Sequence, residues 1–541
     1  MKKRNSALLL AAAMTLGSGI VPVLADETDG KIADGDVTLT IYCSFPDNAR
    51  SHYKDMGDNP VVQKIEEMTG LNLEFVHAPA GDDGSFFQQL IASGELPDLF
   101  ATSQFQTKYP GGVEGAMNDG VLMNVDDLIE EYAVNFNRWV EERKETDPMI
   151  ENKIRSDNGT IVKFGTIWLP PFDDGKIWYG MIARKDLLDK YGLESPVTLE
   201  EYTNVLRTFK ENGIEVPLAL SKFEEGAGSS VLADNPIAGA FGVGINEFQL
   251  GEDGKVHYSR TMDGYKDFLL QLNSWASEGL IDNDFISRSL PESTKLFQNG
   301  TAGMVFEHSI TIKGDLTAGQ ALDPDYDVVA TEYPRINKDD KLHMTHMVSS
   351  VNSYSWQVAS NCEHPVEAVK FVDFLMRDDI VRMTAWGTEE SGTYTEDADG
   401  NRTYTDFVLN NPDGIEYGTM RDLYACTPFQ IKYDQQQEEQ MYTLPQDTGS
   451  WPIWARDNDN AWRLPTWISL TTEEANEMAS IKTKMNNYAD EMVYKFIFGE
   501  ESIEDEWPNF VQTLKDLGSE RGEEIYQAAY DRYLERSETV K

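Results

Sequence analysis

The sequence predicts an α/β protein that consists of two or more compact units. The chain has 541 residues, which is more than a single hydrophobic core normally serves. Hydrophobic residues make up 40% of it and aromatic residues 11%, a composition that disordered chains do not reach. Near the N-terminus, segments with strand-like alternation are interleaved with segments of helical periodicity. This order is typical of a parallel sheet covered by helices.

The first unit begins with a strand–helix repeat. Residues 37–42 alternate apolar and polar side chains, which indicates a half-buried strand. Residues 59–70 predict a helix, because asparagine and proline stand at its start and glycine at its end. A second strand at residues 71–75, a second helix that ends at Gly94 and a third strand that begins at residues 97–100 complete the pattern.

A second unit begins near the aromatic stretch of residues 166–178. Residues 179–183 predict a strand, and residues 185–191 predict a short helix that ends at a glycine. Thr198 and Glu201 have the spacing of a capping box at the start of another helix. Further helices are predicted at residues 262–278, 365–376, 480–498 and 525–536.

The charge balance argues against one broad class of function. The chain has 46 Lys and Arg against 93 Asp and Glu, a formal net charge of −47. Without a cluster of basic residues, such a chain repels a phosphate backbone. We therefore expect no nucleic-acid partner.

The first residues have the order of a secretory signal peptide. Three basic residues at positions 2–4 precede an apolar run over residues 7–16, and small residues follow at positions 23–25. The apolar run is shorter than the ~20 residues that span a bilayer, so a membrane anchor is the weaker interpretation. We expect cleavage after Ala25 and a mature protein that works outside the cytoplasm.

The three cysteines do not form a disulfide framework. Cys43, Cys362 and Cys426 are scattered, and we expect them to be buried as small hydrophobic residues. One disulfide with an odd thiol left over is the alternative. No cysteine stands at the cleavage site, so lipid attachment there is not predicted.

The usual catalytic and metal-binding motifs are missing. The sequence has no nucleophile elbow, zinc-protease motif, P-loop or dinucleotide-binding glycine motif. Residues 397–401 mimic the start of a calcium loop, but Arg402 and Val408 stand where that loop needs glycine and glutamate. We predict no catalytic residue, no metal and no cofactor.

Tryptophan is the most informative residue type. Trp168 and Trp178 flank the start of the second unit, Trp386 precedes a glycine, and four more fall within residues 451–467. Most of them lie outside segments with clear periodicity. Indole rings can stack on the apolar faces of sugars while nearby polar side chains bond the hydroxyl groups. The alternative is that they cover the helices beneath them.

Eight segments, taken in order along most of the mature chain, carry a family resemblance. They are Asn59–Phe75, Ala92–Phe100, Trp178–Gly192, Pro196–Lys210, Glu278–Phe285, Phe297–Phe306, His364–Met376 and Ala529–Tyr533. In order and spacing the chain resembles the extracellular solute-binding proteins of ABC importers. The resemblance is to their long carbohydrate-binding branch, related to the LplA-type and alginate-oligosaccharide-type binding proteins.

The resemblance implies a two-lobed, type II periplasmic-binding-protein-like fold. Hinge strands would cross between the lobes near residues 165–171 and 334–348. The implied division is a signal peptide at 1–25, lobe one at 36–165 plus 346–385, and lobe two at 170–335 plus 390–541.

The resemblance also implies ligand contacts in the loops that follow the sheet strands. Carried over by position, the ligand-binding residues are Ser44, Asp47, Thr102, Gln104, Trp168, Trp178, Phe223, Glu307, His308, Trp386, Trp451 and Trp454. One departure is that the calcium loop that relatives often carry after residues 205–210 is essentially absent. A second is the missing lipidation cysteine.

The leading hypothesis is an exported, monomeric receptor that captures an oligosaccharide between its lobes and delivers it to ABC permease subunits. A secreted glycosidase or lyase is one alternative, which the missing catalytic motifs disfavour. A surface adhesin or signalling receptor is another. A charged sugar stays open, since a local cation such as Arg456 could pair with a carboxylate.

Overall fold

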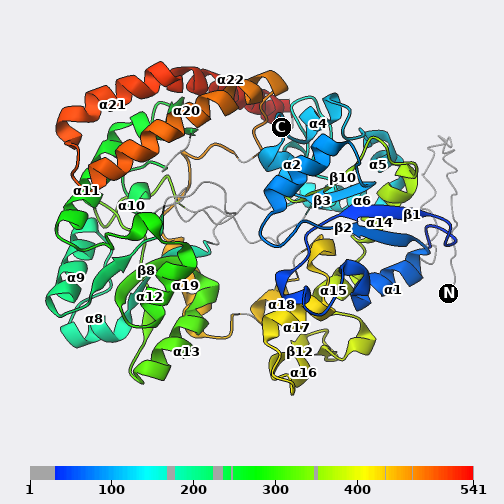
Figure 1. The fold of residues 1–541 in the computed structure, drawn as a ribbon, viewed down its shortest axis with the longest axis horizontal. Helices are drawn as coiled ribbons and strands as arrows, with labels where there is room; N and C mark the ends of the chain where they lie inside the picture. Colours follow the sequence, from blue (N-terminus) through cyan, green and yellow to red (C-terminus); the bar gives the residue numbers. More distant parts are fainter. Residues whose placement is uncertain are drawn as a thin grey trace, which may run out of the picture.

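The chain folds into two α/β halves that lie side by side in the computed structural model (Figure 1). The structure describes residues 31–166, 177–222, 236–244, 248–345, 351–432, 434–440, 442–465 and 467–539. We call the half that holds residues 31–166 and 351–440 lobe one, and the half that holds residues 177–345 and 442–539 lobe two. The expected signal peptide lies outside the described residues, as do parts of both expected crossings.

The sheet of lobe one has the strand order β10-β3-β1-β2. β1 (Thr38–Tyr42) pairs in parallel with both β2 (Asn72–Val76) and β3 (Leu99–Thr102). β10 (Ser355–Val358) comes from much later in the chain and pairs antiparallel with β3. The predicted parallel arrangement of the first three strands is confirmed, and their carboxyl ends lie at one edge of the sheet.

Helix α1 (Pro60–Thr69) shows how local sequence defines the elements of lobe one. The Asn59 side chain accepts a hydrogen bond of 2.9 Å from the backbone N–H of Val61, and Gly70 ends the helix with φ of 70°. The other helices of the lobe are α2 (Asp83–Ser93), α3 (Gln104–Lys108), α4 (Gly112–Asn118), α5 (Asp126–Tyr132), α6 (Val134–Lys144), α7 (Ile150–Ile154), α14 (Pro365–Phe374) and α15 (Asp378–Trp386).

The core of lobe one lies between its sheet and these helices. Leu39 and Ile41 of β1 are fully buried in a cluster that includes residues of α1 and α14. Cys43, Cys362 and Cys426 are buried and free. They act as small hydrophobic residues, as predicted.

Residues 390–431 differ from the expected division, because they pack on lobe one and not on lobe two. Leu423 and Phe429 are buried in the same cluster as the β1 residues. The Asn59 side chain donates a hydrogen bond of 2.8 Å to the carbonyl oxygen of Ala425. This segment adds β11 (Tyr394–Glu396), β12 (Arg402–Tyr404), α16 (Asp406–Leu409) and α17 (Tyr417–Tyr424), and α18 (Gln435–Glu439) follows.

The sheet of lobe two is mixed and has the order β5-β8-β4-β9. β4 (Tyr179–Arg184) runs antiparallel to β8 (Ala302–His308) and to β9 (Val328–Ala330), and β5 (Val216–Ala219) runs parallel to β8. The register pairs the first residue of β4 with the last residue of β8. This pairing brings two predicted ligand segments together.

The helices of lobe two follow their sequence signals closely. The predicted capping box at α9 (Leu199–Glu211) is present, since Thr198 and Glu201 each bond the other's backbone N–H. The remaining elements are α8 (Lys185–Tyr191), α10 (Pro236–Gly239), the hairpin β6 (Phe248–Leu250) and β7 (Val256–Tyr258), α11 (Asp263–Ser277), α12 (Leu290–Gln298), α13 (Ile312–Leu322), α19 (Pro445–Trp454), α20 (Thr472–Ile497), α21 (Ile503–Leu517) and α22 (Ser519–Thr539).

The three C-terminal helices complete the core of lobe two. Met485 and Phe496 of α20 are fully buried in one cluster with Leu269 and Leu272 of α11. The last helix, α22, extends from lobe two toward lobe one (Figure 1). Among the described residues, no helix combines the length and apolar character that crossing a membrane requires.

Candidate ligand-binding site

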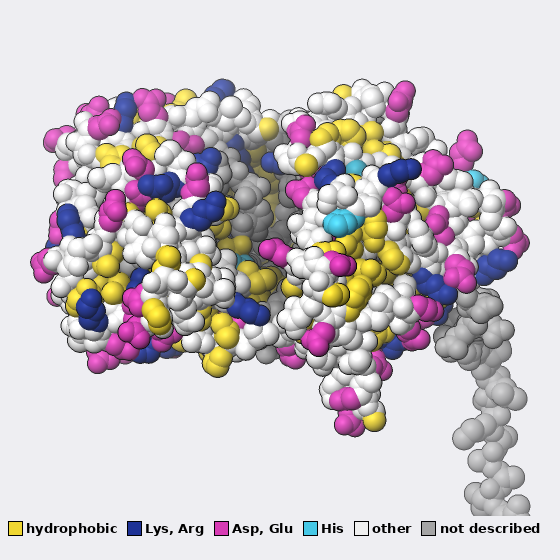
Figure 2. All heavy atoms as spheres, turned by 60° about the horizontal axis from the view of Figure 1, so that its bottom comes forward, with side chains coloured by type: hydrophobic (Ala, Val, Ile, Leu, Met, Phe, Trp, Pro, Cys, Tyr) yellow, Lys and Arg dark blue, Asp and Glu magenta, His cyan; other side chains and the backbone are white. Residues whose placement is uncertain are grey.

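A groove runs between the two lobes, and Figure 2 shows it as a hollow in the surface. Helix α19 lies on the side of lobe two that faces lobe one (Figure 1). Several residues that the sequence analysis singled out lie on α19 or at the adjoining end of β8.

The turn that follows β8 is the short 3-10 helix η5 (Ser309–Thr311). His308 caps this turn, because its Nδ1 accepts a hydrogen bond of 3.0 Å from the backbone N–H of Ile310. The Thr311 hydroxyl donates a hydrogen bond of 2.7 Å to the His308 carbonyl oxygen. The turn is therefore held firmly, while the Ile310 side chain is 44% exposed.

Aromatic residues at the start of β4 adjoin the η5 turn. The backbone N–H of Ser309 donates to the Trp178 carbonyl oxygen at 2.8 Å. The His308 imidazole lies edge-on to the Tyr179 ring, with centroids 4.6 Å apart, and 5.7 Å from the Trp178 ring. The structure thus brings together two predicted residues, Trp178 and His308.

Helix α19 adds a third aromatic group to the turn. The Trp451 Nε1–H donates a hydrogen bond of 3.0 Å to the Ser309 hydroxyl. The Tyr442 ring packs edge-on against Trp451, with centroids 4.9 Å apart. Trp451 is half-buried, in contrast to the fully buried Trp454. A platform of aromatic faces beside hydroxyl and imidazole groups is suited to bind a sugar ring.

Two predicted ligand-binding tryptophans are structural. Trp454 is fully buried, its Nε1–H donates to the Met181 carbonyl oxygen at 3.3 Å, and its ring lies against Gly180. Trp386 is 1% exposed and packs in a small core with Tyr404, at a centroid distance of 4.6 Å. Both assignments were wrong, because each indole fills a core that the sequence pattern did not reveal.

The Glu307 side chain points into the protein interior. Its side chain is fully buried and accepts a hydrogen bond of 2.8 Å from the Thr294 hydroxyl of α12. Burial raises the pKa of Glu307 well above its ordinary value, and the neighbouring Asp315 carboxylate raises it further. The prediction of a direct ligand contact is therefore wrong for this residue.

The predicted residues of lobe one lie at the carboxyl edge of its sheet. Ser44 and Asp47 are exposed in the loop after β1, and Asp47 pairs with Arg50 at 2.8 Å. Thr102 ends β3 and its hydroxyl accepts a hydrogen bond of 3.1 Å from the backbone N–H of Gln104. The carboxamide Oε1 of Gln104 is buried without a hydrogen-bond partner in this structure.

Two predicted residues fall outside the described part of the chain. Trp168 lies within residues 167–176 and Phe223 within residues 223–235. Their predicted ligand contacts stay predictions.

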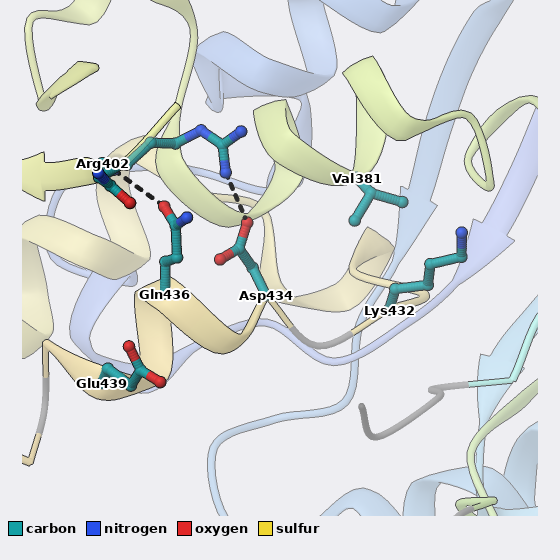
Figure 3. A pocket seen from close by; sticks show the side chains of 7 residues that line it. Val381, Arg402, Lys432, Asp434, Gln436 and Glu439 are labelled. Atoms are coloured by element: carbon teal, nitrogen blue, oxygen red, sulfur yellow. Dashed lines mark hydrogen bonds and ion pairs between the residues drawn. The ribbon is translucent and has the colours of Figure 1, made fainter. Parts of the chain in front are cut away.

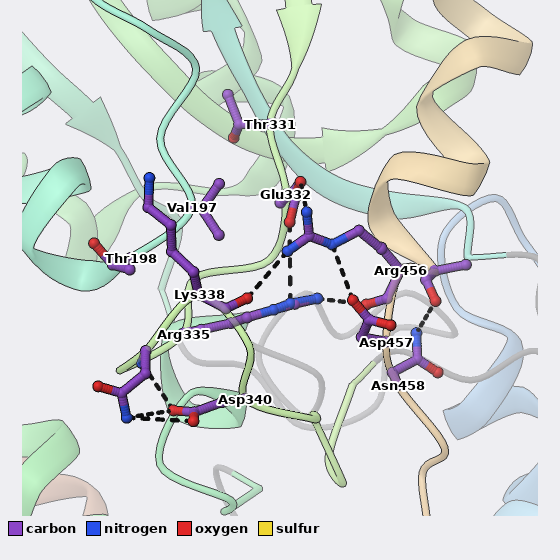
Figure 4. A network of polar contacts seen from close by, with 12 residues as sticks. Val197, Thr198, Thr331, Glu332, Arg335, Lys338, Asp340, Arg456, Asp457 and Asn458 are labelled. Atoms are coloured by element: carbon purple, nitrogen blue, oxygen red, sulfur yellow. Dashed lines mark hydrogen bonds and ion pairs between the residues drawn. The ribbon is translucent and has the colours of Figure 1, made fainter.

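Arg456, considered as a partner for a charged sugar, is already paired (Figure 4). Its Nη1 lies 2.5 Å from Glu332 Oε1, and its Nε lies 3.2 Å from Asp457 Oδ2. The fully buried Arg335 donates to the Arg456 carbonyl oxygen. The network ties the segment after β9 to the segment after α19, so Arg456 has a structural role.

A second polar site is a pocket of about 560 Å³ in lobe one, lined by residues between positions 381 and 439 (Figure 3). Its lining is Val381, Asn401, Arg402, Lys432, Asp434, Gln436 and Glu439. Arg402 is held in place by Asp434 at 3.2 Å and by Glu396 at 2.8 Å. Within the described ranges, no group of three His, Cys, Asp or Glu side chains is placed to hold a metal ion.

Sequence reasoning missed three residues of the η5 platform, namely Tyr179, Ser309 and Tyr442. Tyr179 and Ser309 are direct neighbours in sequence of the predicted Trp178 and His308. That adjacency was an available signal. Tyr442 contacts Trp451 because the chain turns into α19 between them. No local sequence pattern indicates this contact.

Sequence comparison gives one family match and several relatives. Residues 58–381, more than half of the chain, match the family described as bacterial extracellular solute-binding protein. The fructooligosaccharide ABC transporter substrate-binding protein FusA of Streptococcus pneumoniae is 28% identical over 245 residues, 43% of each chain. The polygalacturonan/rhamnogalacturonan-binding protein YtcQ of Bacillus subtilis is 23% identical over 318 residues, 56% of this chain and 57% of YtcQ. The chain thus spans about half the length of these relatives.

Two solved structures are similar along nearly the whole chain. Alginate-binding protein AlgQ2 superposes with a TM-score of 0.71 at 20% identity, covering 93% of this chain and 99% of AlgQ2. An HMO-binding, ABC-transporter-associated solute-binding protein from Bifidobacterium longum infantis gives a TM-score of 0.74 at 16% identity, covering 92% of this chain and 99% of that protein. These likenesses confirm the predicted two-lobed α/β fold.

Proposed function

Because this chain belongs to the bacterial extracellular solute-binding protein family, we propose that it captures an oligosaccharide between its lobes and delivers it to ABC permease subunits. The observation that carries this proposal is the η5 platform, where Trp178, Trp451 and His308 meet around one short turn. FusA and YtcQ, by their names, bind a fructooligosaccharide and polygalacturonan or rhamnogalacturonan. Both names support a carbohydrate ligand for this chain.

The chemistry of the platform suits an oligosaccharide. A pyranose or furanose ring offers an apolar face that packs on an indole, and hydroxyl groups at its rim. The His308 imidazole, whose Nδ1 accepts from the Ile310 N–H, can donate a hydrogen bond from its Nε2–H to one of those hydroxyls. On lobe one, the unpartnered Gln104 Oε1 can accept a further one. Contacts on both lobes would let the ligand draw them together.

Binding by this route needs no covalent step, so we propose a receptor and not an enzyme. The family name and the named relatives describe binding proteins. Capture outside the cytoplasm would follow export through the N-terminal segment, with cleavage after Ala25. We propose that the mature protein acts as a monomer that meets its permease when ligand closes the lobes.

A thermal-shift screen of residues 26–541 against plant, microbial and milk oligosaccharides tests the proposal. A ligand at a hundred times its dissociation constant stabilises the folded state by roughly 2.7 kcal/mol. Trp451→Ala should abolish the shift, while Trp139→Ala, on α6 of lobe one, should leave it intact. No shift with any sugar would contradict the proposal, and release of reducing sugar during incubation would indicate an enzyme instead.

A further inference from the structure

Three buried carboxyl groups lie on the three elements that adjoin the η5 turn. Glu307 comes from β8, Asp315 from α13 and Asp447 from the first turn of α19. Glu307 and Asp315 are fully buried, and Asp447 is 1% exposed. Ligand contact does not explain them, because none of the three reaches solvent.

Each of these carboxyl groups has one oxygen with a donor and one without. Thr294 donates to Glu307 at 2.8 Å, Gln298 donates to Asp315 at 3.0 Å, and a backbone N–H donates to Asp447 at 2.9 Å. Glu307 Oε1, Asp315 Oδ2 and Asp447 Oδ1 are buried without a hydrogen-bond partner. A buried carboxylate oxygen in that state is costly unless a proton supplies the missing bond.

Glu307 and Asp315 can supply that bond to each other. The two carboxyl groups are near enough to shift each other's pKa, and a proton on one of them would let it donate to the free oxygen of the other. Burial raises the pKa of both groups. The neighbouring Asp315 carboxylate raises the pKa of Glu307 further.

The charges that surround the pair do not replace the proton. Asp447 adds a negative charge that raises the pKa of Asp315. Lys313, which is exposed on α13, lowers the pKa of Asp447 by its positive charge, although burial raises it overall. Arg184, which lies over the Tyr326 ring beside the pair, is held by Asp186 at 2.6 Å. Among the residues that the structure describes, none forms an ion pair with Glu307 or Asp315, so two negative charges on them would not be compensated there.

The pair is connected directly to the candidate ligand site. The Thr311 hydroxyl lies beside both carboxyl groups and gives its proton to the His308 carbonyl oxygen at 2.7 Å. Ser309, two residues from Thr311, holds the Trp451 indole. Movement of either acid would shift Thr311, and with it the turn that positions His308 and Trp451.

We propose that Glu307 and Asp315 share one proton and act as a positioning pair, which holds the η5 turn in its binding geometry only while that proton is present. The step is a simple ionisation, in which Glu307 releases the shared proton to hydroxide and leaves two facing carboxylates. The ligand consequence rests on the proposed function, since it treats the η5 turn as the sugar site. The proton itself does not depend on that function.

The pH dependence has a definite sign. The folded state holds this proton more tightly than the unfolded chain, whose glutamate pKa is near 4.5. The contribution of the pair to stability is therefore complete below that pH and is lost as pH rises through the raised pKa of the folded state. The η5 turn should loosen in the same range.

Infrared difference spectroscopy of the ligand-free, full-length mature protein tests the proton. At neutral pH, wild type minus Glu307→Gln should contain the carbonyl band of a protonated carboxyl group. Glu292→Gln, at an exposed capping glutamate of α12 whose pKa is lowered, should give no such band. Absence of the band for Glu307→Gln would overturn the proposal.

Fluorescence of Trp451, taken as wild type minus Trp451→Phe, tests the positioning. In wild type the emission should shift to the red as the pair loses its proton. Glu307→Gln should keep the neutral-pH spectrum at every pH, and Glu307→Ala should be red-shifted throughout. Asp447→Asn should lower the midpoint by roughly one pH unit, because a negative charge is removed.

Either of two results would overturn the positioning role. The first is a Trp451 emission that does not change with pH in wild type, or that still changes with pH in Glu307→Gln. The other is a bound divalent cation in native mass spectra, whose removal by a chelator reproduces the red shift. Because no sugar is used, failure of the transport proposal would leave these readouts unaffected.

Discussion

The Arg532 guanidinium of α22 donates a hydrogen bond of 2.7 Å from its Nε to the Asp157 carboxylate of lobe one. Arg536, one helical turn further on, lies 2.9 Å from the other oxygen of the same carboxylate. Arg532 also pairs with Glu474 of α20 at 2.6 Å. One carboxylate of lobe one is thus held by two cations of the last helix, so α22 joins the lobes.

Asp157→Ala should loosen the contact between the lobes. The Asp157 side chain is only 14% exposed, and its loss removes the carboxylate of lobe one that both partly buried guanidinium groups share. We expect the free energy of unfolding to fall by about 1–3 kcal/mol and the radius of gyration in solution to increase. Glu67→Ala, which removes the exposed partner of Lys64, is the control and should change stability by less than about 0.5 kcal/mol. Equal effects in the two variants would contradict the joining role of α22.

Gly180→Ala should destabilise lobe two, because the strand leaves no room for a side chain there. A Cβ at position 180 would lie 2.2 Å from the Trp454 ring. We expect a loss of about 1–3 kcal/mol in unfolding free energy, measured by chemical denaturation. Gly84→Ala on α2, where a Cβ meets nothing within 4 Å, should be neutral or stabilising by up to about 1 kcal/mol. Equal unfolding free energies for the two variants would contradict the close packing of Trp454 on β4.

Trp451→Phe and Trp454→Phe should separate ligand binding from stability. The first removes the Nε1–H bond of a half-buried indole to Ser309, and the second empties part of a closed core. For Trp451→Phe we expect a roughly 5- to 10-fold weaker affinity for the sugar found in the screen, with an almost unchanged melting temperature. For Trp454→Phe we expect a lower melting temperature. Calorimetric titration and thermal unfolding of both variants measure this, and the reverse pattern would contradict the assignment.

Trp451 and Trp454, three residues apart, show what could not be predicted from the sequence. Helix α1 was predictable because Asn59, Pro60 and Gly70 carry its start and end in a few residues. Helix α19 was not, since it contains a proline and lacks clear periodicity. Which of its indoles is buried depends on Gly180, far away in sequence. Such a contact forms only in the assembled fold.

The same limit applies to the lobe division and to Glu307. The strand–helix order of residues 37–100 predicts three parallel strands, because those pairings are local. The packing of residues 423–431 against β1 joins distant segments, and no local pattern indicates it. Glu307 lies near the end of β8, whose residues 302–307 are all buried, and α12 supplies the Thr294 hydroxyl that bonds its side chain. The position was predicted and the direction of its side chain was not.

Asp459 should make the protein sensitive to acid. Although burial opposes ionisation, hydrogen bonds from His343 at 2.8 Å and Lys341 at 2.9 Å lower the pKa of Asp459 to about 2. A depressed folded pKa stabilises the protein above the unfolded value of 3.8, and that contribution is lost as pH falls toward 2. With 31% of the side chain exposed, solvent screening limits it to roughly 1–2 kcal/mol.

Asp459→Asn should therefore remove one part of the acid sensitivity. We expect the variant to be less stable than wild type at pH 5 and the two unfolding free energies to converge as pH approaches 2. Asp399→Asn, in the exposed turn between β11 and β12, is the matched control and should follow wild type throughout. Chemical denaturation at several pH values between about 2 and 5 measures the difference. A constant gap across that range would show that Asp459 contributes through packing and hydrogen bonds alone, without its charge.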